Sequence, residues 1–477
     1  MGLLIDAAYW SAALVAAPFL ALKSARTGKY RSDWPARFGH GPALFPRRSP
    51  ADKILLLHCV SVGELLSVRH LLDSLLAADP RLRIAISTTT DTATARARTL
   101  FPTSPDARIA PVRYPLDFSF AVEAFLDRVQ PHLIALVELE TWPNFLQIAA
   151  SRRIPVALLN GRITQRSFNR YQLVRPLMAS MLRRVSWFGV QTPAIADRFI
   201  ALGAPPPRIE IIPTLKYDVA DLADAIPGTD ALAHAIGLAP DHQLFVAGSI
   251  APGEEIPLLD AYLALRQKFP NLRLAIAPRH PETVPPTLEA IRQRRLTPVL
   301  RTDRPDSLTT DHWPLTTDHV FLLNTLGELK KLYSLAFAAF VGRSLVPLGG
   351  SDMIEVAALA KPACFGPHTH NFAEAVDLLL AAHAAVLIHN TPDLTATLAN
   401  WLQNPATAHA TGLAARTAIA SQRGSTSRYI QKILDSSPPP VSRRRSGDVS
   451  PSARATPSPI RHTPTPQNPR RGRGQSP

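Results

Sequence analysis

The sequence predicts an α/β protein built from two doubly wound, Rossmann-like parallel sheets. Short runs of apolar and β-branched residues alternate with helical patterns, which is the spacing of strand-helix-strand units. These runs occupy residues 54–58, 84–88, 133–138, 155–160 and 187–191, and later residues 244–249, 272–278, 338–341, 363–365 and 385–388. The prolines of residues 205–241 separate the two series. We therefore expect two domains facing across a cleft, with ligands at the carboxyl ends of their strands.

Composition indicates large globular domains in a reducing compartment. The chain has 477 residues, of which 46% are hydrophobic and 19% charged, which excludes overall disorder and a multi-span membrane protein. Its two cysteines, Cys59 and Cys364, lie far apart in apolar stretches, so we expect buried, reduced thiols rather than a disulfide scaffold. The net charge is +15, and residues 436–477 carry close to half of that excess.

The N-terminus carries a membrane signal. Residues 7–22 are largely apolar and fall short of the ~20 residues that span a bilayer, and Pro18 interrupts them. A basic flank follows, made of Lys23, Arg26, Lys29 and Arg31. This order is the reverse of a cleavable signal peptide and places the body in the cytoplasm. We expect residues 1–31 to form a membrane anchor that either spans or lies on the membrane; a buried first helix is the alternative.

The C-terminal tail has a different composition. Residues 436–477 hold ten prolines and eight arginines among 42 residues, with one aspartate. Such a segment has almost nothing to bury, so we expect a disordered, solvated tail attracted to anionic lipid. A nucleic-acid-binding arm is the alternative, but no aromatic residue is interleaved for base stacking, and nucleic acid is not an expected partner.

Residues 345–372 have the composition of a phosphate and nucleotide site. Gly349 and Gly350 allow the backbone to approach a ligand closely, and a helix expected to start near Ser351 would point its free N–H groups at an anionic group. Glu355, one turn inside that helix, could accept hydrogen bonds from a ribose diol. An ordinary strand-turn-helix connection is the alternative for this segment taken alone.

In the first half, two polar turns follow strands. Residues 58–68, HCVSVGELLSV, place Ser61 in a turn and Glu64 at the start of a helix, where the carboxylate is stabilised as the anion and can accept a proton. An ordinary acid in a first helical turn is the alternative. Residues 87–92, which include Thr89, offer hydroxyls and N–H groups to an anion, or else cap a helix.

Two acids close the apolar run at 133–138. Glu138 and Glu140 stand where the hydrophobic pattern would have an aliphatic residue. They would bind substrate hydroxyls or form structural pairs with Arg162 or Arg166, and we favour the structural pairs because buried acids are usually paired. The two arginines could instead bind phosphates of an acceptor.

The second half adds a further donor set at strand ends. Arg279 and His280, in residues 277–283, combine a guanidinium fork with an imidazole, which suits phosphate binding without a metal. No HExxH motif or paired-cysteine spacing occurs among the fifteen histidines and two cysteines, so neither a metal nor another cofactor is expected.

The motifs together resemble one family. HCVSVGE, the threonine-rich turn, ELETWPN, NGRITQRS, TLKYD, GEE, APRHPE, LGEL, VGRSLVPLGGS and FGPHTHNF occur in the order and spacing of the 3-deoxy-D-manno-octulosonic acid (Kdo) transferases, over about residues 1–430. The resemblance implies a metal-independent GT-B glycosyltransferase at the cytoplasmic face of the inner membrane. It would transfer Kdo from CMP-Kdo to a lipid A precursor, with inversion at the anomeric carbon.

Carried onto this chain, the resemblance makes Glu64 the general base. The donor site would hold Arg279, His280, Gly349, Gly350, Ser351, Glu355 and Asn371, and the acceptor site Ser61, Thr89, Glu138, Glu140, Arg162 and Arg166. The chain departs from the family pattern at Ser351-Asp352, where many relatives have His-Asn, at Arg343, which replaces a glycine, and at residues 248–250, where Gly-Ser-Ile replaces a more usual Ser-Thr pattern. The expected domains are residues 1–31 (anchor), 32–212 (acceptor domain), 213–435 (CMP-Kdo domain) and 436–477 (tail).

Two other functions fit parts of the sequence. Another GT-B nucleotide-sugar enzyme, such as a lipid A disaccharide synthase or a sugar 2-epimerase, would share the fold, but the Ser61–Glu64 turn and ELETWPN argue against it. A non-catalytic protein that binds RNA or a lipid surface would use the basic tail. The retention of Glu64, Arg279 and Glu355 argues against this second alternative.

Overall fold

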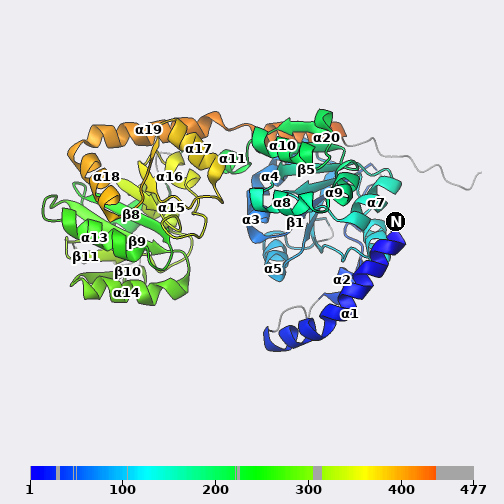
Figure 1. Ribbon diagram of the computed structural model, residues 1–477, viewed down its shortest axis with the longest axis horizontal. Coiled ribbons are helices and arrows are strands. Elements are labelled where there is room, and N and C mark those ends of the chain that lie inside the picture. The colour runs from blue at the N-terminus through cyan, green and yellow to red at the C-terminus, as the bar shows by residue number, and fades with distance from the viewer. Residues whose placement is uncertain are drawn as a thin grey trace, which may run out of the picture. The chain divides into compact units, whose positions relative to one another are not determined.

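The computed structural model describes residues 2–27, 33–46, 48–49, 51–104, 106–220, 222, 226–304 and 314–436, without the side chains of residues 3–4, 18 and 20–27. The described residues all lie in one compact unit, residues 1–440. Two seven-stranded sheets form its framework (Figure 1). The predicted class, α/β with two doubly wound sheets, is confirmed. The predicted tail lies outside the described residues apart from Ser436, as do Lys29 and Arg31 of the basic flank.

The first sheet has the order β3-β2-β1-β4-β5-β6-β7, with all its strand pairs parallel. Its edge strand β7 falls inside residues 205–241, whose prolines were expected to separate the two series of strands. That expectation is wrong, because an edge strand needs only one partner and tolerates nearby prolines. The strands are β1 (Lys53–Cys59), β2 (Leu82–Thr88), β3 (Ile109–Arg113), β4 (Leu133–Val137), β5 (Val156–Gly161), β6 (Trp187–Val190) and β7 (Ile209–Ile211).

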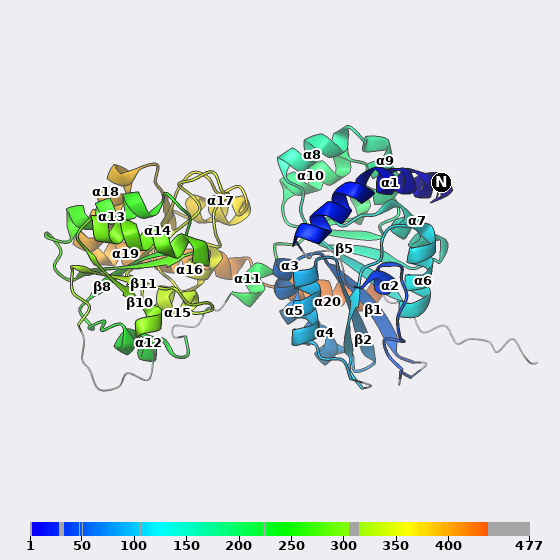
Figure 2. The same cartoon turned by 90° about the horizontal axis from the view of Figure 1, so that it is seen from below.

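Helices cover both faces of the first sheet (Figures 1 and 2). Ile54 and Leu56 of β1 pack in one core, and Leu55 and Leu57 pack in another, because successive side chains of a strand point to opposite faces. Burial on both faces explains why the strands read as continuous apolar runs. The helices are α2 (Trp34–Arg37), α3 (Val62–Ser67), α4 (Arg69–Ala78), α5 (Asp91–Leu100), α6 (Ser119–Val129), α7 (Pro143–Ser151), α8 (Gln165–Gln172), α9 (Arg175–Leu182) and α10 (Pro193–Ala201), with a 3-10 turn η1 (Pro206–Arg208).

The second sheet has the order β10-β11-β9-β8-β12-β13-β14, and its pairs are also parallel. A separate hydrophobic core lies on each of its faces. Cys364 in β13 and Cys59 in β1 are both buried free thiols, as predicted. The strands are β8 (Gln243–Ile250), β9 (Leu272–Pro278), β10 (Thr297–Leu300), β11 (His319–Leu322), β12 (Ala338–Val341), β13 (Ala363–Phe365) and β14 (Ala385–Leu387).

The chain after β7 supplies the helices of the second sheet and then returns to the first. The last helix, α20, was expected in the domain 213–435, but Tyr429 and Ile433 pack in the core of the first sheet with Leu55 and Leu57. Its apolar stripe needs a partner, and α4 offers one. These helices are α11 (Lys216–Val219), α12 (Thr229–Ala235), α13 (Glu255–Leu265), α14 (Val284–Gln293), α15 (Leu329–Ser334), α16 (Ile354–Ala358), α17 (Ala373–Ala381), α18 (Thr391–Gln403), α19 (Pro405–Ser421) and α20 (Ser425–Ser436), with turns η2 (Pro281–Thr283) and η3 (Arg301–Asp303).

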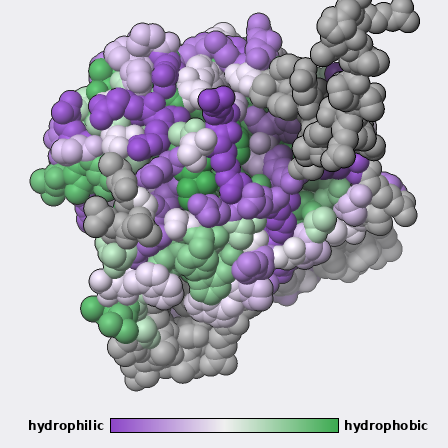
Figure 3. Space-filling model, turned by 90° about the vertical axis from the view of Figure 1, so that its right-hand side faces the viewer, coloured by the Kyte–Doolittle hydropathy of each residue, from purple (hydrophilic) through white to green (hydrophobic). Residues whose placement is uncertain are grey.

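The predicted anchor segment forms the helix α1 (Gly2–Thr27). Its first turns are tied to the first domain, because Tyr9 Oη donates to Asp117 Oδ2 at 2.9 Å and the Asp6 carboxylate binds Ser119 and Asn144. Farther along, Leu14 and Val15 are both 80% exposed. Figure 3 shows hydrophobic patches on a face that is otherwise mostly hydrophilic. Within the described part of the chain, no helix is long and apolar enough to cross a membrane.

Candidate active site

Both sheets reverse their strand order where the candidate residues gather. In the first sheet the reversal falls between β1 and β4, which are followed by Glu64 and by Glu138 and Glu140. In the second it falls between β8 and β12, which are followed by residues 251–254 and 342–350. Ligands of open α/β sheets bind outside the carboxyl ends of the strands at such points. These two sets of loops are therefore the candidate site.

Glu64 is held in the first turn of α3 by a reciprocal cap. Ser61 Oγ accepts from the Glu64 N–H at 3.3 Å and donates to Glu64 Oε1 at 2.8 Å. The Val60 N–H donates to Oε2 at 2.8 Å. Burial raises the pKa of Glu64, hydrogen bonds from Val60 and Ser61 partly offset the rise, and the charge of Glu138 adds to it. Ser61 and Glu64, which were both predicted as site residues, thus contact each other, and the carboxyl group is held in place with a raised pKa.

Glu138 and Glu140 bring two more carboxyl groups to this point. Glu138 directly follows β4 and has φ 62, in the left-handed region that a non-glycine residue rarely adopts. Burial and then the charge of Glu64 raise the pKa of Glu140 to about 7. Within the described residues, neither acid pairs with Arg162 or Arg166. The structural pairs favoured by the sequence are therefore wrong. Burial is met in Glu140 by a raised pKa, which favours the neutral acid, and not by an ion pair.

A pocket of about 270 Å³ opens beside these acids. The Arg162 Nη2 at its wall donates to the Asn371 carbonyl at 2.9 Å, whereas Arg166 is exposed and does not line it. A second pocket of about 300 Å³ lies at the amino end of β1, where ligands of such sheets do not bind. The pocket of about 270 Å³ beside the acids has a mostly polar lining, which suits a ligand rich in hydroxyl groups. Its lining residues are Glu138, Leu139, Glu140, Arg162, Ile163, Thr164, Ser167, Tyr171 and Asn371.

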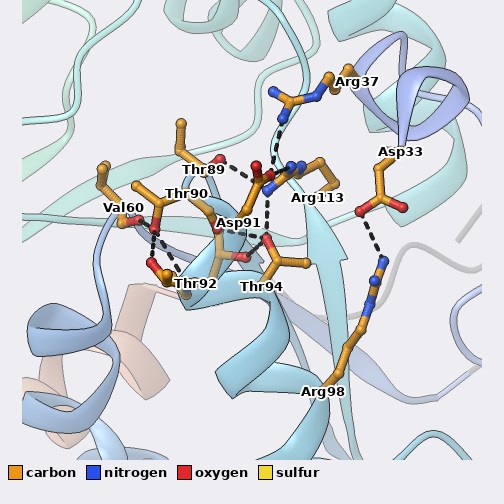
Figure 4. A network of polar contacts seen from close by, with 12 residues as sticks. Asp33, Arg37, Val60, Thr89, Thr90, Asp91, Thr92, Thr94, Arg98 and Arg113 are labelled. Atoms are coloured by element: carbon orange, nitrogen blue, oxygen red, sulfur yellow. Dashed lines mark hydrogen bonds and ion pairs between the residues drawn. The ribbon is translucent and has the colours of Figure 1, made fainter. Parts of the chain in front are cut away.

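A buried arginine holds the threonine-rich turn between β2 and α5 (Figure 4). Arg113, at the end of β3, donates to the Thr89 carbonyl at 3.0 Å and to Thr94 Oγ1 at 2.7 Å, and it forms an ion pair with Asp91. Arg37 of α2 also pairs with Asp91, at 3.2 Å. The sequence analysis did not single out Arg113, because its partners lie about twenty residues away and are mainly backbone or hydroxyl oxygens.

This turn is connected to the Glu64 carboxylate. Thr90 Oγ1 donates to the Val60 carbonyl at 3.1 Å, and the Val60 N–H is the group that binds Glu64. Thr90 also caps α5 by accepting from the Ala93 N–H at 3.2 Å, whereas the predicted Thr89 is exposed. A series of hydrogen bonds therefore runs from Arg113 through the turn and the backbone of Val60 to Glu64.

In the second domain, Gly349 and Gly350 turn the chain after β12. Both have positive φ, 87 and 81. A Cβ at Gly349 would lie 2.2 Å from Asn371 Nδ2, so this position requires glycine. The Gly350 N–H donates to the Arg343 carbonyl at 2.8 Å, and the Asn371 N–H donates to the Gly349 carbonyl at 3.0 Å. The predicted glycine pair and Asn371 thus form one structure.

The helix expected near Ser351 begins at Ile354 instead and has five residues. Asp352 Oδ1 accepts from the Ile354 N–H at 3.1 Å, and its Oδ2 lies 3.4 Å from Lys216 Nζ. Asp352, the residue before the N-cap Met353, therefore accepts the first N–H of α16 and has a cation beside it. Ser351 is buried, and its Oγ has no hydrogen-bond partner among the described residues. Lys216 belongs to the TLKYD motif but was not assigned to the predicted site. Sequence reasoning therefore missed it.

Arg279 and His280 follow β9 with exposed side chains. The Arg279 N–H donates to the Ile250 carbonyl at 3.0 Å, which fixes the start of this loop at the reversal point. The Glu355 side chain reaches the surface, yet desolvation by the surrounding protein and then the charge of Asp352 raise its pKa to about 6. The positive charge of Arg279 opposes that rise. Arg279 and Glu355 therefore lie within electrostatic reach of each other, as a shared ligand site requires.

Glu254 is a third residue, after Arg113 and Lys216, that sequence reasoning did not assign to the site. It is fully buried, and its carboxylate accepts four backbone N–H bonds. Ala251 and Arg343 bind Oε2 at 2.8 and 2.6 Å, and Ser344 and Leu345 bind Oε1 at 2.8 and 2.9 Å. Glu254 thus joins the loop after β8 to the loop after β12 across the reversal point. Three of its partners lie about ninety residues away, so no local spacing could reveal them.

Across the described parts of the chain, no three His, Cys, Asp or Glu side chains form a group that could hold a metal ion. The expected independence of a metal stays a prediction.

Comparison with known proteins adds the family context. Residues 32–219 match the family model described as 3-deoxy-D-manno-octulosonic-acid transferase (kdotransferase). The 3-deoxy-D-manno-octulosonic acid transferase of Haemophilus influenzae is 28% identical over 433 residues, which is 90% of this chain and 96% of that protein. The enzyme of the same name from Bordetella pertussis is 29% identical over 417 residues, 86% of this chain and 92% of its own. The resemblance predicted from the motifs is confirmed.

Solved structures support the fold. The UDP-GlcNAc 2-epimerase of Neisseria meningitidis aligns with 80% of this chain and 100% of its own, with a TM-score of 0.53 and 13% identity. Anabaena Alr3699/HepE, solved with UDP, aligns with 80% of this chain and 98% of its own, with a TM-score of 0.53 and 14% identity. At such low identity the likeness concerns the fold alone.

Proposed function

Because the chain is similar to Kdo transferases over most of its length, we propose that it is a glycosyltransferase that moves Kdo from CMP-Kdo to a lipid A precursor. The observation that carries this proposal is the position of Glu64. This carboxyl group lies where the first sheet reverses its order, and its pKa is raised. A general base works best when its pKa lies close to the working pH.

In the proposed reaction a hydroxyl oxygen of the acceptor attacks the anomeric carbon of Kdo. The bond from that carbon to the phosphate oxygen breaks, CMP departs with the bonding electrons, and Glu64 takes the hydroxyl proton. Attack opposite the leaving group inverts the anomeric configuration. Glu64 donates no bond to the cap, so it can accept this proton while the Val60 N–H keeps it oriented.

The other site residues take their places around this reaction. We assign the CMP phosphate to the Gly349–Gly350 loop, Ser351, Arg279 and His280, and the ribose to Glu355 with Asn371 nearby. The acceptor disaccharide belongs to the polar pocket with Glu138, Glu140 and Arg162, with Ser61 and Thr89 at its edge and Arg166 reaching the acceptor phosphates. Backbone N–H groups and arginines stabilise a departing phosphate without a metal.

The proposed location is the cytoplasmic face of the inner membrane. A lipid A precursor is anchored in lipid, so an enzyme acting on it benefits from attachment to the same surface. The exposed apolar side chains of α1, among them Leu14, Val15 and Phe19, support this assignment.

The test is transfer itself. The protein, with and without residues 436–477, is incubated with CMP-Kdo and a detergent-dispersed lipid A precursor, with and without EDTA. We expect CMP release, a lipid product heavier by Kdo, the inverted anomeric configuration by NMR, and no effect of EDTA or of the tail. UDP-GlcNAc replaces the donor in a parallel reaction. Conversion of UDP-GlcNAc with no turnover of CMP-Kdo would overturn the proposal.

A further inference from the structure

Arg343 adopts a backbone conformation that disfavours its own side chain. Its φ is 61, in the left-handed region where a side chain crowds the backbone and glycine is preferred. Two backbone bonds hold it there, since its N–H donates to Glu254 at 2.6 Å and its carbonyl accepts from the Gly350 N–H at 2.8 Å. Both bonds would form equally well with glycine. The side chain at this strained position therefore calls for an explanation outside the folding of the loop.

The guanidinium lies on the glycine loop. Arg343 Nη2 donates to the Leu348 carbonyl at 3.2 Å, and Asn371 Nδ2 donates to the same oxygen at 3.3 Å. The Arg343 and Asn371 side chains therefore meet at one atom, directly before the Gly349–Gly350 turn. This is the turn to which we assigned the donor phosphate.

The charge of Arg343 is not neutralised within the described structure. No carboxylate forms an ion pair with it there, and its Nε is buried without a hydrogen-bond partner. Two acids of the surrounding loops already bind other groups. Glu254 binds four backbone N–H groups, and Asp352 pairs with Lys216. A half-buried cation without a partner is costly unless an anion joins it.

We propose that the Arg343 guanidinium binds an anionic oxygen of the donor, on its phosphate or on the carboxylate of its sugar. This inference rests on the proposed function and adds a binding residue to it. Arginine suits both groups, because its planar fork donates two parallel hydrogen bonds to a phosphate or a carboxylate. The remaining N–H groups, beyond the one that binds Leu348, are the donors.

The variant Arg343→Gly tests this without endangering the fold. Glycine keeps both backbone bonds and relieves the left-handed strain, so the melting temperature should be equal to or above that of the unaltered protein. The matched control is Arg295→Gly. Arg295 also belongs to the second domain, also has positive φ, 57, and is exposed after α14, away from the reversal point. The control removes the same charge and relieves the same kind of strain.

The measurements are calorimetric titrations with CMP and with cytidine, and the KM for CMP-Kdo. If the phosphate is the ligand, Arg343→Gly weakens CMP binding by about 10-fold or more and leaves cytidine binding unchanged, as expected for a lost charge-assisted hydrogen bond. If the sugar carboxylate is the ligand, CMP binding stays the same and the KM for CMP-Kdo rises by a similar factor. In either case Arg295→Gly changes neither quantity.

The proposal is overturned if Arg343→Gly leaves both CMP affinity and the KM unchanged, or if Arg295→Gly reproduces its effect. These results are distinct from failure of the proposed function. In that case the unaltered protein itself would bind no CMP and transfer no Kdo.

Discussion

Glu64 Oε1 and Ser61 Oγ lie 2.8 Å apart, and the same serine oxygen accepts the N–H of Glu64 at 3.3 Å. The proposed base is therefore also a helix cap. A capping acid keeps its orientation without substrate, which preorganises it for proton transfer. A substitution at Glu64 therefore has to preserve these hydrogen bonds if a loss of catalysis is to be distinguished from a loss of stability.

Glu64→Gln meets that condition. The amide oxygen can still accept the Val60 N–H, so we expect normal CMP binding and a melting temperature close to that of the unaltered protein. Transfer should fall by ~10²-fold or more, because the amide cannot take a proton. Single-turnover transfer and CMP titration measure the two effects. Transfer at a near-normal rate would remove Glu64 from the reaction.

Arg113→Lys should lower kcat while leaving the donor site intact. Lysine keeps the charge but cannot contact Thr89, Thr94 and Asp91 together, so the turn and the Val60 peptide lose their support. Small displacements of a catalytic group cost about 10- to 100-fold in rate. CMP affinity should be unchanged.

The matched control for Arg113 is Arg108→Lys. Arg108 also donates to backbone carbonyls in this domain, including that of Leu82 at 3.2 Å, but at the amino end of β2. An equal loss of kcat in both variants would show that Arg113 has only a structural role.

Glu140→Gln should make stability less dependent on pH. The folded-state pKa of Glu140 is about 7, above the ordinary value of 4.5, so the folded protein binds more protons than the unfolded chain between those values. Stability then falls as pH rises from 4.5 through 7, and the neutral amide removes this loss. The melting temperature of the variant relative to the unaltered protein should therefore be higher at pH 8 than at pH 4.5. A pH-independent difference would contradict the shift.

Arg279→Ala should weaken CMP affinity by roughly 1.5–3 kcal/mol, the range for a hydrogen bond to a charged group, and leave cytidine binding unchanged. The side chain is exposed and makes no hydrogen bond or ion pair with the residues that the structure describes, so the melting temperature should not move. Calorimetry with both ligands checks the prediction. Unchanged CMP affinity would remove Arg279 from the donor site.

Substitutions in the two parts of α1 should change membrane binding and stability independently. Leu14 and Phe19 are 80% and 68% exposed, so replacing both by glutamine should leave the melting temperature and detergent activity unchanged and reduce co-sedimentation with anionic vesicles. Tyr9→Phe removes the hydrogen bond to Asp117, so it should lower the melting temperature and leave vesicle binding unchanged. Normal vesicle binding by the double variant would show that α1 is only a structural helix.

Hydrophobic pattern located the central strands but not several short ones. The runs at 54–58 and 133–138 are long enough to predict β1 and β4, because burial on both faces requires an unbroken apolar sequence. β3 and β10 contain Pro111 and Pro298, which a strand tolerates best at the edge of a sheet, and both lie at an edge. β7 lies between Pro205–Pro207 and Pro213, and these prolines hid its three residues within what reads as a break between the two series of strands.

The site was predictable where function depends on local sequence. Ser61 and Glu64 are three residues apart, so a capping motif reveals them. Glu254 and Arg113 bind main-chain groups of distant segments. Such contacts do not depend on the side chains of those segments, so no sequence pattern predicts them. The start of α16 was predicted near Ser351, three residues too early, because the N-cap is Met353, a residue type that gives no capping signal.

The return of α20 to the first sheet makes the first domain discontinuous in sequence. Tyr429 Oη accepts the Asn160 N–H at 2.8 Å, and Asp218 accepts the Gly424 N–H at 2.7 Å beside it. A fragment that stops before α20 would leave an apolar groove along α4 open to water and would lose the bond between Tyr429 and Asn160. Two separately expressed pieces, one ending near residue 212 and one starting there, should therefore assemble with each other, because the second carries the missing helix of the first.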